Sequence, residues 1–184
     1  QKKIRLFVGV SGFVTKKMVD LGVSERYTKT IHNGLEIIGW KPNPVIPGKI
    51  FTIGIVGQVG RWKGHEDLVL ALDILRKREP GLVFRLCIFG GGEPEFKNEL
   101  EALIREKNLE NYIEWKGFVK NIKEIYSGLQ VVCVPTRTEE PFATSALEAG
   151  LYAIPVIVTR KGGFPEIVKE GHSGYIVEAN DPGA

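Results

Sequence analysis

Short apolar segments rich in β-branched residues alternate with longer amphipathic segments along most of the chain. Apolar runs of this length are typical of buried strands, and apolar residues repeated at three- and four-residue spacing are typical of helices. The pattern predicts strands at residues 50–56, 82–89, 113–116, 130–134, 155–159 and 174–177. It predicts helices at residues 65–79, between Gly92 and about residue 107, at 121–126, after Pro141 and at 165–168. This alternation predicts an α/β fold with a doubly wound parallel (Rossmann-like) sheet, in which ligands bind at the carboxyl ends of the strands.

The first part of the chain has a separate pattern. A strand is predicted at residues 4–10, and Ser11 is placed to cap a following helix that ends at Gly22. The apolar face predicted for this helix consists of Phe13, Val14, Met18 and Leu21. After a second short strand at 27–31, residues 35–49 are rich in proline, a composition that breaks regular structure and indicates a linker.

Composition narrows the class of protein. With 184 residues, 43% of them hydrophobic, the chain can bury the core of a globular domain. The net charge of +3 is small, and a clustered basic stripe that would indicate a nucleic-acid partner is missing. Cys87 and Cys133 lie in apolar runs, so we interpret both as reduced core residues, consistent with a cytoplasmic protein. No apolar run approaches the ~20 residues of a membrane-spanning helix.

Two glutamates, Glu140 and Glu148, follow the predicted strand at 130–134. Pro141 can open a helix between them, because the N–H that proline lacks would be unpaired at that position. Free backbone N–H groups and the positive end of the helix dipole would then favour an anion at the helix start. Glu148 would lie about two turns further on and accept hydrogen bonds from hydroxyl groups. This spacing suits a nucleotide-sugar; the alternative is a first-turn glutamate and a surface carboxylate without a ligand.

A second candidate site follows the strand at residues 50–56. Residues 57–64 contain three glycines, which let the backbone approach a ligand closely, and the basic residues Arg61 and Lys63. The alternative is a glycine-rich turn with solvated basic side chains. Residues 90–92, all glycine, stand at another strand end and either line the same cleft or form a simple turn.

The segment from Glu140 to Glu148 has the E-x7-E form of retaining glycosyltransferases with the two-domain GT-B architecture, especially family four (glycosyl transferases group 1). An isolated E-x7-E arises by chance on many helices, but the flanking segments resemble this family too, in the same order. They are residues 31–36, 57–64 and 153–168. The resemblance implies the C-terminal, donor-binding half of such an enzyme. Residues 1–49 would be the tail of the preceding acceptor-side domain plus a hinge linker, and residues 50–184 the nucleotide-sugar donor-binding domain.

The resemblance also implies roles for individual residues. Glu140 is expected to position the donor sugar, Lys63 and Arg61 to hold the pyrophosphate as it leaves, and Glu148 to hold the ribose hydroxyls. These expectations make Glu140, Lys63 and Arg61 the catalytic set. The other residues expected to bind the donor are Gly57, Gln58, Gly60, Val119, Phe142, Ala143, Thr144 and Ser145.

Two positions depart from the family pattern. The family usually has arginine where Gln58 stands, so the charge on the leaving group falls on Lys63, with Arg61 as a substitute if its side chain turns inward. The family commonly has glycine at Ala143. Val119 matches the position whose backbone reads the base, and we interpret its neighbour Phe118 as a core residue.

Glycosyl transfer must neutralise charge on the departing nucleoside diphosphate. The chain contains no Asp-x-Asp pair and no His, Cys and carboxylate cluster with metal-ligand spacing. Cationic side chains and a helix N-terminus offer the other solution. We therefore expect no cofactor and no metal.

These inferences predict a metal-independent hexosyltransferase of polysaccharide biosynthesis, with UDP-glucose as the expected donor and a glycan or lipid-linked sugar as acceptor. The acceptor would bind the preceding domain. If the acceptor is lipid-linked, it would bring that domain to the inner face of the membrane. The alternatives are a non-catalytic nucleotide-sugar-binding module or a sugar-nucleotide epimerase. A dinucleotide-dependent oxidoreductase is disfavoured, because the Gly-x-Gly-x-x-Gly fingerprint is missing. We interpret His65 as a surface residue, and no histidine belongs to a recognisable triad.

Overall fold

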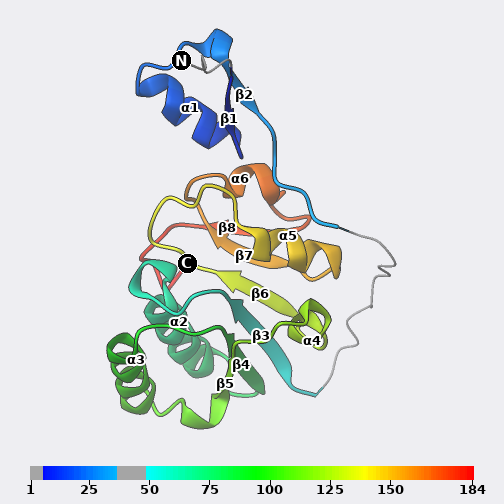
Figure 1. The fold of residues 1–184 in the computed structure, drawn as a ribbon. Coiled ribbons are helices and arrows are strands. Elements are labelled where there is room, and N and C mark those ends of the chain that lie inside the picture. Colours follow the sequence, from blue (N-terminus) through cyan, green and yellow to red (C-terminus); the bar gives the residue numbers. More distant parts are fainter. Residues whose placement is uncertain (1–5, 37–48) are drawn as a thin grey trace.

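The computed structural model describes residues 6–36 and 49–184, which form a small and a large parallel sheet (Figure 1). In the small sheet, β1 (Phe7–Gly9) pairs with β2 (Thr28–Thr30), and helix α1 (Gly12–Asp20) connects them. The large sheet consists of β3 (Phe51–Val56), β4 (Phe84–Phe89), β5 (Ile113–Gly117), β6 (Val131–Val134), β7 (Val156–Thr159) and β8 (Gly174–Val177). The helices around it are α2 (His65–Arg78), α3 (Pro94–Glu106), α4 (Ile122–Tyr126), α5 (Thr144–Leu151) and α6 (Phe164–Ile167).

The strand order of the large sheet is β5-β4-β3-β6-β7-β8, with every neighbouring pair parallel. This confirms the predicted doubly wound parallel sheet. The chain runs outward from β3 to one edge, then returns to β6 and runs to the other edge. The loops that leave the carboxyl ends of β3 and β6 therefore diverge at the point where ligands bind in such sheets.

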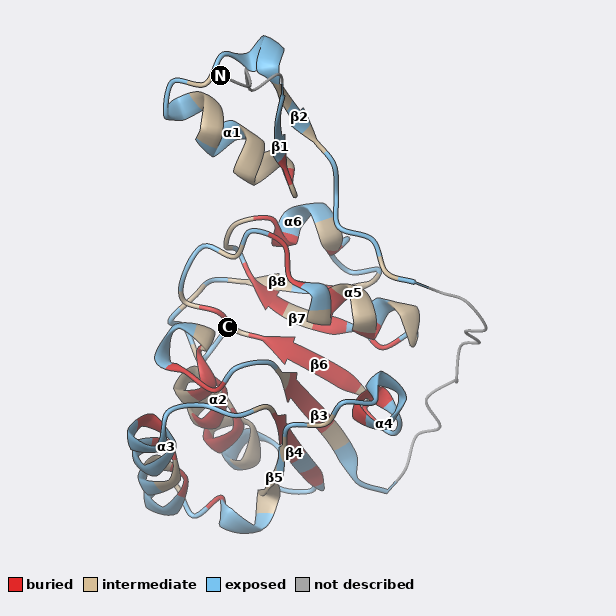
Figure 2. Cartoon of the chain, in the orientation of Figure 1, coloured by how far each residue is buried: buried red, intermediate tan, exposed pale blue. Residues whose placement is uncertain are grey.

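Apolar clusters cover both faces of the large sheet, and buried residues concentrate in its central strands (Figure 2). Leu72 of α2 and Leu100 of α3 pack on one face; Tyr126, Ala146 and Phe164 of α4, α5 and α6 pack on the other. Both cysteines are buried, as predicted, and burial raises the pKa of Cys133 to about 12.

The predicted elements occur, with shifts at their ends. Ser11 caps α1 as expected, since its Oγ accepts a hydrogen bond from the N–H of Val14 at 3.1 Å. The apolar face predicted for this helix is wrong at Leu21, which is 86% exposed and lies beyond the last turn. Most of the predicted linker, residues 37–48, lies outside the described residues. Within the described part, no helix combines the length and apolar character needed to cross a bilayer.

Candidate functional site

The loop after β3 (residues 57–64, the β3 loop) lies against the glycines that follow β4. Val59 N–H donates to the Gly91 carbonyl at 2.9 Å, and Gly57 N–H donates to the Phe89 carbonyl at 3.0 Å. Gly90 has φ +131°, and a Cβ there would lie 1.8 Å from the Gly57 carbonyl oxygen. Only glycine allows this approach, so the Gly90 segment is part of the site's framework rather than an independent turn.

The β3 loop is also joined to the loop between β6 and α5 (residues 135–143, the β6 loop). The Trp62 carbonyl accepts from the Arg137 N–H and from the Thr136 hydroxyl, both at 2.8 Å. Gly64 has φ +71°, and a Cβ on it would lie 1.9 Å from the Pro135 carbonyl oxygen. These contacts hold the two loops together at the crevice outside the carboxyl ends of β3 and β6, where the strand order reverses.

This junction brings Lys63 and Glu140 together. Lys63 Nζ lies 2.6 Å from Glu140 Oε2, and the two side chains are 26% and 18% exposed. The pair comes from two segments that are far apart in sequence but follow adjacent strands. Such partial burial leaves both groups accessible to a ligand while limiting their competition with water.

The shape of the β6 loop is set by the two glycines before α6. Gly163 N–H donates to the Glu140 carbonyl at 2.8 Å, and Gly162 N–H to the Glu139 carboxylate at 2.6 Å. Gly162 has φ +57°, and a Cβ there would lie 2.0 Å from the Glu140 carbonyl oxygen. The Glu140 carbonyl thus accepts from Gly163 and not from an N–H group of a helix that begins at Pro141. The prediction that Pro141 opens the helix is therefore wrong.

Helix α5 instead begins at Thr144, which places Glu148 about one turn from its start rather than two. Ala143 precedes the helix with φ −78° and ψ 110°, a conformation that alanine adopts without strain. Its side chain makes no cap, so the first N–H groups of α5, at Thr144 and Ser145, lack a side-chain partner from the cap position. Phe142 and Ala143 are buried, whereas Thr144 is exposed.

Glu148 is held by a residue that the sequence did not single out. The Tyr126 hydroxyl donates to Glu148 Oε2 at 2.7 Å, and its ring stacks on Tyr152 with centroids 5.4 Å apart. Tyr126 is 1% exposed. Burial and the neighbouring Glu148 carboxylate raise the pKa of Tyr126 far above its ordinary value, so the hydroxyl remains a proton donor. The available sequence signal is weak: a tyrosine predicted to be buried needs a partner for its hydroxyl.

Arg61 points elsewhere. Its guanidinium pairs with Glu99 of α3, lies 3.5 Å from Glu66 of α2 and sits over the ring of Phe96 at 5.1 Å. The structure therefore does not bring Arg61 to the Lys63–Glu140 pair. Gly60, at the start of the Arg61–Lys63 turn, is buried beneath the Trp62 ring.

A cavity of about 370 Å³ opens beside the β3 loop at the carboxyl ends of β3, β4 and β5. It is lined by Val56, Gly57, Gln58, Phe89, Gly90, Gly91, Phe118, Val119 and Ile125. Gln58 and Val119, both predicted to bind the donor, thus share one cavity. The interpretation of Phe118 as a core residue is wrong: it is 84% exposed, because Gly117 turns the chain out of β5 at φ +64°.

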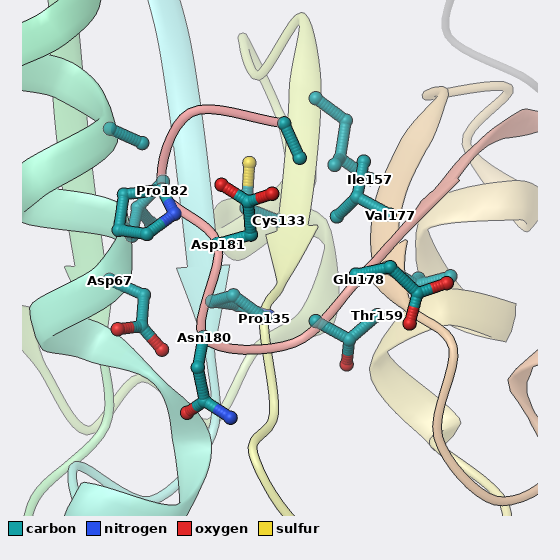
Figure 3. Close-up of a pocket in the computed structure, with 14 residues that line it drawn as sticks. Asp67, Cys133, Pro135, Ile157, Thr159, Val177, Glu178, Asn180, Asp181 and Pro182 are labelled. Atoms are coloured by element: carbon teal, nitrogen blue, oxygen red, sulfur yellow. The ribbon is translucent and has the colours of Figure 1, made fainter.

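A smaller cavity of about 130 Å³ lies between α2, the strands β6 and β7, and the C-terminal segment (Figure 3). Cys133 and Ile157 face it from the sheet, with Asp181 and Pro182 on the covering segment. The predicted donor-binding residues lie outside it.

His65, interpreted as a surface residue, is 3% exposed, so that interpretation is wrong. It begins α2 directly after the β3 loop, and its burial lowers its pKa to about 4. The imidazole is therefore neutral at pH 7. Within residues 6–36 and 49–184, no group of three or more His, Cys, Asp or Glu side chains is placed to hold a metal ion.

Comparison with known proteins decides the family. The family model for glycosyl transferases group 1 matches residues 38–184. The chain belongs to this family. It is 33% identical over 142 residues to D-inositol 3-phosphate glycosyltransferase of Corynebacterium jeikeium (strain K411), an alignment that covers 74% of the chain and 34% of that protein.

Two solved structures have a similar fold. The C-terminal domain of LpcC, a glycosyl transferase group 1 family protein from Francisella tularensis, is 29% identical with a TM-score of 0.67, covering 81% of the chain and 82% of that domain. Anabaena HepE, in complex with UDP and glucose, has a TM-score of 0.86 at 24% identity, covering 97% of the chain and 50% of HepE. The chain thus has the fold of the C-terminal GT-B domain and spans about a third of the corynebacterial relative.

Proposed function

We propose that this chain is the donor-binding part of a retaining, metal-independent glycosyltransferase that moves a hexose from a nucleotide-sugar to a glycan or lipid-linked acceptor. The observation that carries the proposal is the Lys63–Glu140 pair at 2.6 Å, set where the strand order reverses in a group 1 chain. A cation and a carboxylate in one crevice match the two ends of a sugar diphosphate. Membership of the family supports the reaction class.

In this proposal the donor changes the partner of Lys63. The ammonium group moves from Glu140 to the pyrophosphate, where it stabilises charge that grows as the diphosphate leaves. Glu140 is then free to accept hydrogen bonds from the hydroxyls of the sugar. Backbone N–H groups of residues 142–145 meet sugar and phosphate at the start of α5. Glu148, oriented by Tyr126, holds the ribose hydroxyls.

The base occupies the cavity of about 370 Å³. The backbone at Val119 reads the edge of the base, and the exposed ring of Phe118 at the same rim offers a stacking surface. HepE has been solved with UDP and with UDP-glucose, which supports uracil as the base and UDP-glucose as the donor.

The acceptor belongs to the preceding domain, of which residues 1–49 form the tail and hinge. A glycan or lipid-linked acceptor places the whole enzyme in polysaccharide assembly in the cytoplasm, at the inner membrane face where the acceptor is lipid-linked. The separate small sheet of β1 and β2 supports this division of the chain. This chain alone is expected to bind the donor without transferring the sugar.

One observation favours a second candidate, a non-catalytic nucleotide-sugar-binding module. Gln58 brings no charge, and Arg61 is engaged by Glu99 and Glu66, so Lys63 stands without the second cation that the family usually supplies. Product analysis with the full-length protein separates the candidates: transfer with retained anomeric configuration supports the enzyme, an epimerised nucleotide-sugar supports an epimerase, and unchanged donor supports the binding module.

Calorimetric titration of the chain with UDP, GDP, ADP and UDP-glucose tests donor binding. Lys63→Ala and Glu148→Ala should each weaken UDP binding by about 1–3 kcal/mol, as expected for hydrogen bonds to charged groups. Lys29→Ala, on the exposed part of β2, is the matched control and should bind as the wild type does. The proposal would be refuted if UDP, GDP and ADP all failed to bind, or if the Lys63→Ala and Glu148→Ala variants bound UDP with the affinity of the wild type.

A further inference from the structure

One carboxylate makes several of the contacts between the N-terminal unit (residues 6–36) and the rest of the chain. Glu166 of α6 accepts hydrogen bonds from the backbone N–H groups of Gly12 at 2.7 Å and Phe13 at 2.9 Å, at the start of α1. Unpaired N–H groups and the positive helix end favour a carboxylate there. Partial burial opposes ionisation, but these N–H groups and His32 hold the pKa of Glu166 below its ordinary value.

The same carboxylate contacts the segment that leaves the N-terminal unit. Glu166 Oε2 lies 3.0 Å from Nε2 of His32. The ring of His32 in turn stacks on the ring of Phe142, with centroids 5.3 Å apart and planes inclined by 12°. Phe142 is 8% exposed and belongs to the β6 loop, two positions after Glu140. A continuous set of contacts therefore runs from the start of α1 to the loop that carries Glu140.

A second set of contacts reaches the same loop from the other end of α6. Gly163, which precedes α6, donates to the Glu140 carbonyl at 2.8 Å. It also lies against the N-terminal unit, since a Cβ on Gly163 would be 3.1 Å from Cβ of Ser11. The β6 loop is thus held between His32 and the glycines before α6, and both supports touch the N-terminal unit.

We propose that His32 and Glu166 are positioning residues for donor binding: through Phe142 they set the position of the β6 loop and couple it to the seating of the N-terminal unit. This inference rests on the proposed function, because it takes the N–H groups of residues 142–145 as donor contacts. His32 lies just before the predicted hinge linker, so a change in the seating of the N-terminal unit would reach the donor site through the His32–Phe142 contact. Donor affinity would then depend on the arrangement of the two domains.

Three variants separate the contacts. His32→Ala removes both the stacking and the bond to Glu166, whereas His32→Phe keeps an aromatic ring over Phe142 without a nitrogen. Glu166→Gln keeps the size of the side chain. It replaces the carboxylate, whose two oxygens accept from the N–H groups of Gly12 and Phe13, by a neutral amide with one acceptor oxygen. The matched controls are His172→Ala and Glu110→Gln, which change exposed residues outside the β6 loop and the N-terminal unit.

UDP affinity is measured by calorimetry on the 184-residue chain. His32→Ala should raise the Kd about threefold to tenfold, the range expected for loss of one aromatic pair. His32→Phe should recover most of this loss, Glu166→Gln should also weaken binding, and both controls should match the wild type. A His32→Ala variant that binds UDP as well as the wild type, or a His32→Phe variant that recovers nothing, would overturn the proposal.

Amide NMR spectra of the ligand-free chain test the coupling without a nucleotide. In His32→Ala, the amide resonances of residues 142–145 should move, and in Glu166→Gln those of Gly12 and Phe13 should move as well. Unchanged resonances at 142–145 in both variants would refute the positioning role even if UDP binds normally. Failure of the wild type to bind UDP, GDP and ADP alike would instead refute the proposed function, so the two failures are distinguishable.

Discussion

Removing a single hydroxyl group, in Tyr126→Phe, tests whether Glu148 is held ready for the ribose. The Tyr126 ring is 1% exposed and packs on Tyr152, so phenylalanine fills the same space and leaves no cavity. The variant loses the 2.7 Å hydrogen bond to Glu148 Oε2 and the 3.2 Å contact to the Ser145 carbonyl. The perturbation is therefore confined to the two α5 groups that the hydroxyl contacts, the Glu148 carboxylate and the Ser145 carbonyl.

The structure sets the magnitude. A hydrogen bond to a charged group contributes about 1.5–3 kcal/mol, but Glu148 is only half-buried and water can replace the hydroxyl. We expect the free energy of unfolding to fall by about 1–2 kcal/mol, which is at or below the lower end of that range. A Glu148 side chain freed from Tyr126 must be immobilised by the ligand itself, at about 0.5–1.5 kcal/mol. The Kd for UDP should therefore rise about twofold to tenfold.

Urea unfolding followed by circular dichroism gives the stability, and calorimetric titration with UDP gives the affinity. Tyr175→Phe, at a residue of β8 that is 59% exposed, is the control for loss of a tyrosine hydroxyl outside the site. A variant that loses stability but keeps the wild-type Kd would show that Tyr126 only packs the core. Unchanged stability and unchanged Kd together would refute the hydrogen bond itself.

Three further outcomes follow from the same geometry. UDP binding should survive excess EDTA, because the proposed function has Lys63 rather than a metal meet the phosphates; loss of binding that Mg²⁺ restores would contradict this. Burial lowers the pKa of His65 to about 4 from 6.5, so between these values the unfolded chain binds a proton that the folded chain does not. The free energy of unfolding should thus fall as the pH falls, by up to about 1.4 kcal/mol per pH unit, and urea unfolding of His65→Gln at pH 7 and pH 5 should show a smaller loss than the wild type. Gly64→Ala should destabilise the chain by more than about 1–2 kcal/mol in urea and weaken UDP binding, because the left-handed backbone and the Pro135 carbonyl both oppose a Cβ; Gly81→Ala, where a Cβ meets nothing within 4 Å, should change neither.

The sheet was predictable because the information it needs is local. An apolar strand such as residues 130–134 and an amphipathic helix such as residues 65–79 differ in period, and period follows directly from which side chains are buried. The alternation of the two types then leaves few topologies, since parallel strands need crossover helices. The positions of the β3 and β6 loops at one crevice follow from that topology.

Two of the errors concern residues whose surroundings come from distant parts of the chain. Pro141 has the local character of a helix start, but Gly163 N–H donates to the Glu140 carbonyl and Gly162 N–H donates to the Glu139 carboxylate, and the helix begins only at Thr144. His65 follows a polar loop yet is buried beside Phe96 of α3, with ring centroids 6.4 Å apart. Neither effect is encoded within one window of sequence, because each depends on how segments far apart in the chain pack together.

The partner of Tyr126 was equally out of reach. Tyr126 and Glu148 are 22 positions apart and lie on different helices, α4 and α5. Sequence spacing relates residues within one helix, where neighbours on a face are three or four positions apart, but it carries no distance between two helices. The site was predictable where strand ends bring its parts together, and unpredictable where helix packing does.

The same distinction explains why Lys63 and Glu140 meet. Each lies on a loop whose backbone is fixed by another loop: the β3 loop by the hydrogen bonds to the Trp62 carbonyl, and the β6 loop by Gly162 and Gly163. Backbone hydrogen bonds restrict the loops, so the two side chains need little further ordering to form their pair. Under the proposed function, a diphosphate that enters the crevice would exchange one anion for another at Lys63, instead of meeting an unpaired, fully hydrated ammonium group. Separating Glu140 from Lys63 costs free energy. Only a ligand that offers Lys63 at least as much negative charge, and that also offers hydroxyl donors to Glu140, offsets this cost. This is a physical reason for the crevice to prefer a sugar diphosphate over a bare phosphate.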